Sequence, residues 1–404
     1  MNHRLAIDGG SPTRTTPLPP WPYYGNDEIE AVANVLRSGK VNQWTGPAVS
    51  DFERAFADYV GVKHAVAVSN GTVSLELVLR AWGIGPGDEV IVSPRSFLAS
   101  ASTIAFIGAI PIFADVDPDT QTISAQTVRA ALSPRTRALM VVHLAGLPAE
   151  MDELMALANE HKLLVLEDCA QAHGAIYKGQ MVGAIGHAGS FSFCQDKIMT
   201  LGGEGGMITT DDDELFRKVW ELKDHGKSRE AVFEREHPPG FRWLHESLGT
   251  NARLTGMQAA IGLRQLDKLE QWIEARTANA NALVNRFKDH PALRFPNTPT
   301  HVRHAWYRVY AFVRPEALKP DWSRDRILEA LQAEGVPGLS GSCSEMYLEK
   351  VFQDRGLAPK ERLPLAQELG ETSLMFLCHP TLTPNDMKDI GDALEKVLAA
   401  ATTP

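Results

Sequence analysis

The sequence predicts an α/β protein with a mainly parallel β-sheet in a large domain and a smaller α+β domain toward the C-terminus. From about residue 64, short apolar runs alternate with helical segments of ten or more residues, and such crossover connections are what parallel strands require. The apolar runs are nearly unbroken, which is typical of strands covered on both faces. The chain has 404 residues, more than one hydrophobic core usually holds, so two domains are expected.

The first part of the chain is predicted to form an arm, a helix and the first strands. Residues 1–25 are rich in proline and lack periodicity, which predicts an extended arm. Residues 26–39 begin with a capping side chain, continue with an amphipathic pattern and end in glycine, so they predict a helix. The strand candidates that alternate with helical segments are HAVAVS (64–69), EVIVSP (89–94), IPIFADV (110–116), RALMVVHL (137–144) and KLLVLED (162–168).

The second part of the chain is predicted to complete the sheet and to form the smaller domain. Its expected elements are strands GSFSFC (189–194) and GMITTDD (206–212), a helix over 212–225, a loop over 226–250, one long helical run over 254–287, a strand over 306–313, and helices over 324–335 and 385–400. We place the domain boundary inside or beside the long helical run, near residue 265. The predicted limits are 1–25 for the arm, 26–265 for the large domain and 266–404 for the small domain.

Composition narrows the class of protein. The net charge of −10 gives no electrostatic footprint for nucleic acid, so no nucleic-acid partner is expected. No apolar run approaches the length of a membrane-spanning helix, and the N-terminus does not resemble a signal peptide. The four cysteines are scattered without a C-x-x-C pair, which favours free thiols over a zinc site or a disulfide framework. We therefore expect a soluble cytoplasmic protein without a bound metal.

Two polar features fall where strands are predicted to end. Ser69-Asn70-Gly71-Thr72 lies between a strand and a helix, where free N–H groups and the helix dipole suit a phosphate group. Taken alone, such a turn is more often an ordinary helix cap without a ligand. Asp168 ends an otherwise apolar strand, so its carboxylate must be solvated, paired or functional. Ligands bind at this edge of an open parallel sheet.

Lys197 lies in the stretch SFSFCQDKIMTLGGEGG, residues 190–206. A single lysine is usually a solvated surface cation, and glycines alone indicate a tight turn. Together with Asp168 and the phosphate-type turn, however, Lys197 completes the set of groups that pyridoxal phosphate requires. These groups are a lysine for a Schiff base, an acid for the pyridine nitrogen and a cradle for the phosphate.

At these residues the sequence resembles the DegT/DnrJ/EryC1/StrS family of sugar aminotransferases, which are fold-type I pyridoxal-phosphate enzymes. The resemblance extends from about residue 7 to the C-terminus. The matching segments, in order, are IDGG (7–10), SNGT (69–72), GIGPGDEVIV (83–92), EDCAQAHGA (167–175), SFSFCQDK (190–197), GGEGGM (202–207) and GTNARLTGMQAAIG (249–262).

The resemblance implies catalytic roles for two residues and ring contacts for two more. Lys197 would bind pyridoxal phosphate as a Schiff base and then act as the general base, in a desolvated and neutral state. Asp168 would keep the pyridine nitrogen protonated. Phe97 would stack on the ring face, although the same residue could be ordinary core. Gln171 would lie beside the ring and its phenolic oxygen.

The resemblance also implies a phosphate site shared between two subunits. Gly71, Thr72 and Ser192 would bind the phosphate group from one subunit, and Asn251 would reach it from the neighbouring subunit. The active site would then depend on a homodimer, with Arg253 and the 226–250 loop shaping the interface.

The implied activity is transfer of an amino group from glutamate or glutamine to a keto sugar. This sugar would be nucleotide-linked and used in the biosynthesis of polysaccharide, lipopolysaccharide or an antibiotic. The stretch 336–352 lacks a histidine that many nucleotide-sugar members carry, and Glu345 in it would be a poor neighbour for a diphosphate. A free keto sugar or cyclitol ketone is therefore an alternative substrate. A sugar dehydratase, disfavoured because those members replace the lysine with histidine, and a non-catalytic regulatory relative are further alternatives.

Overall fold

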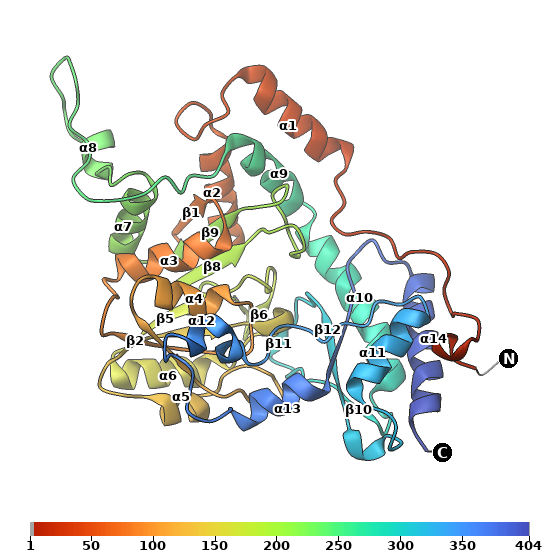
Figure 1. The fold of residues 1–404 in the computed structure, drawn as a ribbon. Helices are drawn as coiled ribbons and strands as arrows, with labels where there is room; N and C mark the ends of the chain where they lie inside the picture. The colour runs from red at the N-terminus through yellow and green to blue at the C-terminus, as the bar shows by residue number, and fades with distance from the viewer. Residues whose placement is uncertain (1–3, 404) are drawn as a thin grey trace.

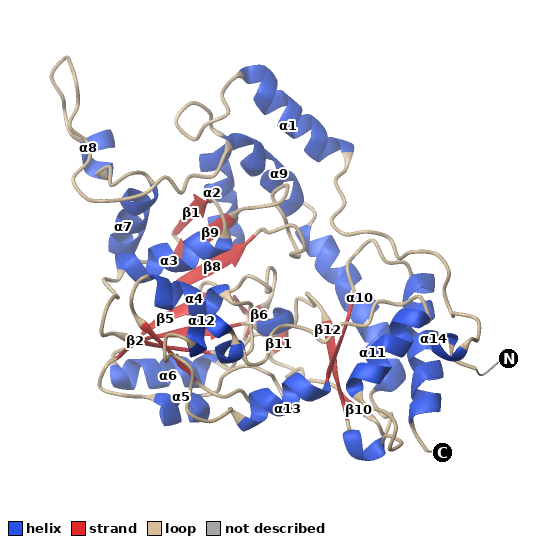
Figure 2. Cartoon of the chain, viewed as in Figure 1, coloured by secondary structure: helices blue, strands red, loops and turns tan. Residues whose placement is uncertain are grey.

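A seven-stranded β-sheet forms the centre of the larger unit (Figures 1 and 2). The computed structural model describes residues 4–403. The strands lie in the order β1-β9-β8-β5-β4-β2-β3. Their bounds are β1 His64–Val68, β2 Glu89–Val92, β3 Ile110–Phe113, β4 Thr136–Val142, β5 Leu164–Asp168, β8 Ala188–Ser192 and β9 Gly206–Thr210.

The sheet is mainly parallel, as predicted. The pairs β8–β5, β5–β4, β4–β2 and β2–β3 are parallel, whereas β9 is antiparallel to both β8 and β1. Because β1 and β8 both run against β9, they point in the same direction. The carboxyl ends of β1, β8, β5, β4, β2 and β3 therefore lie at one edge of the sheet, the edge where ligands bind in such folds.

Helices cover both faces of this sheet, which explains the unbroken apolar strands. Alternate residues of one strand belong to different cores: Val90 and Val92 pack with α3 and α4, whereas Ile91 packs with α5 and α6. A third core lies under α2 and α9. These helices and their neighbours span α1 Asn26–Ser38, α2 Ala48–Val60, α3 Gly71–Ala81, α4 Ala99–Phe106, α5 Ala125–Ala131, α6 Met151–His161, α7 Asp213–Lys223, α8 Arg229–Phe233 and α9 Gly256–Leu266.

The smaller unit is built on a three-stranded antiparallel sheet in the order β10-β12-β13. Its core joins that sheet to α10, α11 and α14 (right in Figure 1). A third small sheet, β11-β6-β7, links the chain after α10 to the larger unit. The elements are α10 Leu269–Phe287, β10 Leu293–Arg294, β11 Val302–Arg303, β12 Val309–Val313, α11 Arg324–Ala333, α12 Lys350–Gln353, α13 Pro364–Thr372, β13 Ser373–Phe376 and α14 Pro384–Ala401, with β6 Ile176–Tyr177 and β7 Gln180–Met181 in the larger unit.

The N-terminal arm runs along the smaller unit before α1 (Figure 1). Leu5 is buried in the core of the smaller unit, and Trp21 packs edge-on against Trp272 of α10. The indole N–H of Trp21 also donates to the backbone oxygen of Lys197 at 2.8 Å. Residues 1–3 of the predicted arm lie outside the described residues. The arm therefore connects the smaller unit to the loop that carries Lys197.

The region expected to be one helix over 254–287 forms two helices. The helix α9 ends at Leu266 and α10 begins at Leu269. Lys268, between them, forms ion pairs of 2.6 Å with Asp27 and Glu28 of α1. The break lies beside the predicted boundary of 265/266, and the domain limits stay a prediction. Across residues 4–403, no helix is both long and apolar enough to cross a membrane.

Candidate active site

A cavity of about 950 Å³ opens at the carboxyl edge of the large sheet, where the larger unit faces the smaller one. The larger unit contributes the ends of β5 and β8 and the start of α3, and the smaller unit contributes Leu339, Met375 and the stretch 341–343. Seven of the eight site residues expected from the sequence line this cavity: Gly71, Thr72, Phe97, Asp168, Gln171, Ser192 and Lys197.

The phosphate-type turn forms the start of α3. The side chain of Asn70 caps the helix by accepting from the Val73 N–H at 2.9 Å. The N–H groups of Gly71 and Thr72, in the first turn, have no acceptor within the helix. Both residues line the cavity together with Ser192. Two free backbone donors, a hydroxyl and the helix dipole therefore surround one place where an anionic oxygen would be stabilised.

This part of the site is held by close backbone contacts that require glycine. Gly206 at the start of β9 pairs with both Val68 and Ser192, which places the strand ends side by side. A Cβ at Gly206 would lie 2.4 Å from the backbone oxygen of Asn70, and a Cβ at Gly71 would lie 2.5 Å from the Cβ of Ser192. Any other residue at either position would push the α3 terminus away from β8.

Asp168, the last residue of β5, is 5% exposed. Its Oδ2 accepts from the Ser100 hydroxyl at 2.7 Å and its Oδ1 accepts from the Ala170 N–H at 3.1 Å. Burial raises the pKa of Asp168, and these hydrogen bonds oppose that rise only in part. A buried carboxylate of this kind is stabilised by a cationic or protonated partner.

Lys197 also lines the cavity, and its side chain is 14% exposed. The Nζ atom is 3.4 Å from the Tyr307 hydroxyl and 3.5 Å from Oδ1 of Asp196. Burial alone would lower the pKa of Lys197, but the neighbouring Tyr307 hydroxyl and Asp196 carboxylate outweigh burial and raise it. The Asp196 carboxylate and the Tyr307 hydroxyl therefore favour the protonated amine, and the neutral amine that the transfer reaction requires stays a prediction.

Gln171 and Phe97, the two residues predicted to contact the cofactor ring, both line the cavity. The side-chain oxygen of Gln171 accepts from the Ala145 N–H at 2.8 Å, so its amide N–H₂ group remains for a ligand. Phe97 lines the cavity and is 67% exposed. An aromatic ring with that much free surface at the mouth of a cavity is not part of the core, so the core alternative for Phe97 is wrong.

Asn251 lies outside the cavity. Its backbone forms a bridge with Asp224, and its side chain is exposed. It follows the 226–250 loop, which projects from the body beyond α8 (upper left in Figure 1). Phe241, Trp243 and Leu248 on this loop are more than three-quarters exposed. An exposed apolar loop of this kind is typical of a surface that another protein chain covers.

Several residues at the site were missed from the sequence. Ser100, whose hydroxyl donates to Asp168, lies on α4, and no motif in the sequence of this helix points to a function. Tyr307 donates to Asp196, and Arg308 contacts the same carboxylate at 3.4 Å. Asp196 directly precedes Lys197, a position that could have drawn attention to it. For Tyr307 and Arg308, more than 100 residues away, the sequence offers no signal.

The expectation that Glu345 faces the substrate is wrong. Glu345 does not line the cavity; it pairs with Arg362 at 2.5 Å and accepts from the Tyr347 hydroxyl at 2.5 Å. The guanidinium of Arg362 lowers the pKa of Glu345 and balances its charge. The sequence argument against a diphosphate substrate therefore loses its physical basis.

A cluster of His143, Glu167 and Cys169 has the ligand types of a metal site. Glu167, however, accepts from the His143 ring at 3.0 Å and from the backbone N–H groups of Gly183, Ile185 and Gly186. These donors already use both carboxylate oxygens. The cluster is therefore a buried hydrogen-bond network beneath the site.

Comparison with known proteins agrees with this geometry. Residues 22–395 match the model of the DegT/DnrJ/EryC1/StrS aminotransferase family. The chain belongs to this family. The predicted family resemblance is confirmed, and the protein is an aminotransferase.

Individual members of the family resemble the chain over nearly its whole length. A crystal structure of an aminotransferase from Psychrobacter cryohalolentis is 50% identical, with a TM-score of 0.94, covering 95% of this chain and 99% of that one. The L-glutamine:2-deoxy-scyllo-inosose aminotransferase of Streptomyces paromomycinus is 40% identical over 98% of each chain. GDP-perosamine synthase of Caulobacter vibrioides is 37% identical over 87% of this chain and 91% of its own. The fold-type I architecture is thereby confirmed.

Proposed function

We propose that this family member uses pyridoxal phosphate to transfer an amino group from an amino acid to the ketone of a sugar or cyclitol. The observation that carries the proposal is the gathering of Lys197, Asp168 and the α3 terminus around one cavity. These groups come from three segments that are far apart in the sequence, and each suits a different part of one cofactor.

The residues present fit pyridoxal phosphate. The free N–H groups of Gly71 and Thr72, with the Ser192 hydroxyl, would hold the phosphate. Asp168, buried and lacking a cation of its own within hydrogen-bond distance among the described residues, would pair with the protonated pyridine nitrogen. Phe97 would cover the ring, and the Gln171 amide would donate to the phenolic oxygen. When bound, the cofactor supplies an electron sink for the bond that is broken at the amino acid's α-carbon.

Lys197 would carry the proton that moves during transfer. Its amine is a cation beside Asp196 and Tyr307, so it must lose a proton before it can attack a carbonyl group. Asp196 and the Tyr307 hydroxyl lie within reach of Nζ and would orient the amine. The same amine, released when substrate binds, would then act as the general base.

The substrate class rests on the relatives. One acts, by its name, on a cyclitol ketone with L-glutamine as the donor, and another makes a GDP-linked amino sugar. We propose a keto sugar, nucleotide-linked, with a cyclitol ketone as the second candidate. A dehydratase or a non-catalytic regulatory relative is disfavoured because Lys197 is present and its surroundings are complete.

We also propose a homodimer with shared active sites in the cytoplasm. The exposed loop that leads to Asn251 would cross to the partner and bring Asn251 to the phosphate there. Arg253 is anchored to the buried Asp224 at 2.5 Å, which would hold the base of this loop. All four cysteines are free thiols, as expected in a reducing compartment.

The test follows the cofactor's absorbance and the product. Protein loaded with pyridoxal phosphate should be yellow, and glutamate or glutamine should bleach it to the aminated cofactor. Keto substrates, with and without a nucleotide, would then be screened by mass spectrometry for gain of an amino group. Lys197→Ala should abolish turnover, whereas the exposed Lys63→Ala should not change it. Turnover by Lys197→Ala with both substrates would refute the proposal.

A further inference from the structure

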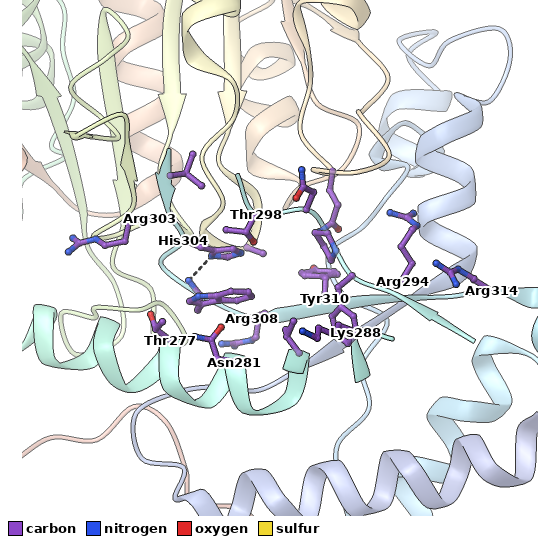
Figure 3. Close-up of a pocket in the computed structure, with 18 residues that line it drawn as sticks. Thr277, Asn281, Lys288, Arg294, Thr298, Arg303, His304, Arg308, Tyr310 and Arg314 are labelled. Atoms are coloured by element: carbon purple, nitrogen blue, oxygen red, sulfur yellow. Dashed lines mark hydrogen bonds between the residues drawn. The ribbon is translucent and has the colours of Figure 1, made fainter. Parts of the chain in front are cut away.

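A second cavity, of about 730 Å³, lies between α10 and the chain from residue 294 to residue 314 (Figure 3). We refer to it as the basic crevice. Five cationic side chains line it, and no acidic side chain is among its described lining residues. The cations are Lys288, Arg294, Arg303, Arg308 and Arg314. Such a one-signed lining in a concave site concentrates anions.

Three of these cations are not neutralised by a close ion pair among the described residues. Arg294 donates to the backbone oxygen of Pro118 at 2.7 Å, and its nearest carboxylate, Asp119, is 4.0 Å away. Arg314 donates to the Pro291 oxygen at 3.3 Å, and Lys288 forms no ion pair within residues 4–403. A backbone carbonyl orients a guanidinium without neutralising it, so a positive field remains in the crevice.

The other two cations are partly neutralised. Arg303 forms a two-point ion pair with Glu270 at 2.7 and 3.0 Å, at the opposite end of the crevice from Arg294 and Arg314 in Figure 3. Arg308 is 8% exposed and contacts Asp196 on the active-site side. Its Nε is buried without a hydrogen-bond partner in the described part of the chain. One buried donor of the crevice wall is therefore unsatisfied.

A sixth positive charge lies behind the crevice wall. Arg95 is completely buried, its Nε donates to Gln121 at 3.1 Å, and its guanidinium lies 5.2 Å from the ring of Tyr310. Gln121 and Tyr310 both line the crevice. Neither terminal nitrogen of Arg95 has a partner, and no carboxylate forms an ion pair with it, among residues 4–403. A buried cation without a counter-ion is costly and is stabilised by an anion nearby.

The crevice differs from the cofactor cavity. Among the described residues, Arg308 is the one lining residue that the two cavities share. The rings of His304 and Trp306, which both line the crevice, stack with their centroids 3.9 Å apart (His304 is labelled in Figure 3). Burial lowers the pKa of His304 to about 3, so this ring adds no charge. The positive field therefore comes from the arginines and Lys288.

We infer that the basic crevice is a second binding site, for a diphosphate-type anion, held by Arg294, Arg314 and Lys288. Guanidinium groups match the oxygens of phosphate in pairs, and the lysine adds a mobile point charge. The site goes beyond the transferase activity, because none of the groups that we assign to the cofactor belongs to it.

The test is calorimetric titration of the cofactor-loaded protein with inorganic pyrophosphate at low salt. Loading keeps the α3 phosphate site occupied, so it cannot supply the signal. We expect one saturable site whose affinity falls as salt is raised. Arg294→Gln and Arg314→Gln should each weaken binding about tenfold or more, since a hydrogen bond to a charged group contributes that much. Arg355→Gln, an exposed arginine outside the crevice, should leave the affinity unchanged.

Two further measurements can contradict the inference. Lys288→Gln alters an exposed side chain without an ion pair in the described chain, so it should weaken binding without affecting folding. A nucleoside diphosphate, titrated in parallel, should lose affinity in the same variants if the crevice accepts the diphosphate of a larger molecule. A response from pyrophosphate alone would assign the site to the free anion. No saturable heat with pyrophosphate, or an affinity equal to that of the parent protein in all three crevice variants, would overturn the inference, whatever the outcome for turnover.

Discussion

Replacing Ser100 with alanine should weaken the binding of pyridoxal phosphate by removing a hydrogen bond from Asp168. Within the described chain, the buried carboxylate accepts only from the Ser100 hydroxyl, at 2.7 Å, and from the Ala170 N–H. A hydrogen bond to a charged group contributes about 1.5–3 kcal/mol. If that energy is lost from the complex in which Asp168 pairs with the cofactor, the Kd for the cofactor should rise about 10- to 150-fold.

The pH dependence should change in a defined direction. Burial already raises the pKa of Asp168, and the Ser100 hydroxyl opposes this rise. Ser100→Ala should raise the pKa further, so that cofactor affinity begins to fall at a higher pH as the solution is acidified. The assay is titration of cofactor-free protein with pyridoxal phosphate, followed by absorbance, across a pH series.

A matched control lies on the same helix. Ser102 of α4 is only partly buried, and its hydroxyl forms no hydrogen bond within residues 4–403. Ser102→Ala should therefore bind the cofactor like the parent protein, and thermal melting should show that both variants are folded. Parental affinity and an unshifted pH profile in Ser100→Ala would refute the role assigned to this hydroxyl.

Three further predictions concern stability and charge. Gly71→Ala should destabilise the protein in urea unfolding by about 1–3 kcal/mol and abolish cofactor binding, because its Cβ would lie 2.5 Å from that of Ser192. Gly85→Ala, with open space around its Cβ, should change neither the stability nor cofactor binding. The pKa of Asp168 is raised in the folded protein, so the cofactor-free protein should lose stability as the pH rises from the ordinary aspartate pKa through the folded-state value. In thermal melts across this pH range, Asp168→Asn should remove the loss. Glu167→Gln should cost about 3 kcal/mol or more in urea unfolding, because an amide cannot accept from all four donors around the buried carboxylate; parental stability would contradict that network.

The sequence alone predicted much of the fold because the relevant signals are local. Unbroken apolar runs such as 164–168 identify strands covered on both faces, and glycine and proline mark the turns between them. The predicted strand ends then indicate which polar residues lie near a ligand, and Asp168 and the α3 terminus are at such ends. The sequence pattern does not show the break between α9 and α10. Lys268, between these helices, pairs with Asp27 and Glu28 of α1, a distant contact that no local pattern records.

The surroundings of these residues were decided by tertiary structure. Tyr307 meets Lys197 across 110 positions of sequence, and Ser100 meets Asp168 across 68. Tyr307, which folding brings next to Lys197, acts together with the adjacent Asp196 to raise the pKa of this lysine, whereas burial by itself would lower it. Glu345 shows the same effect in reverse, because Arg362 balances a charge that the sequence left unpaired. Residue types and strand ends are properties of the chain, whereas protonation, orientation and neighbouring charges exist only once distant segments pack together.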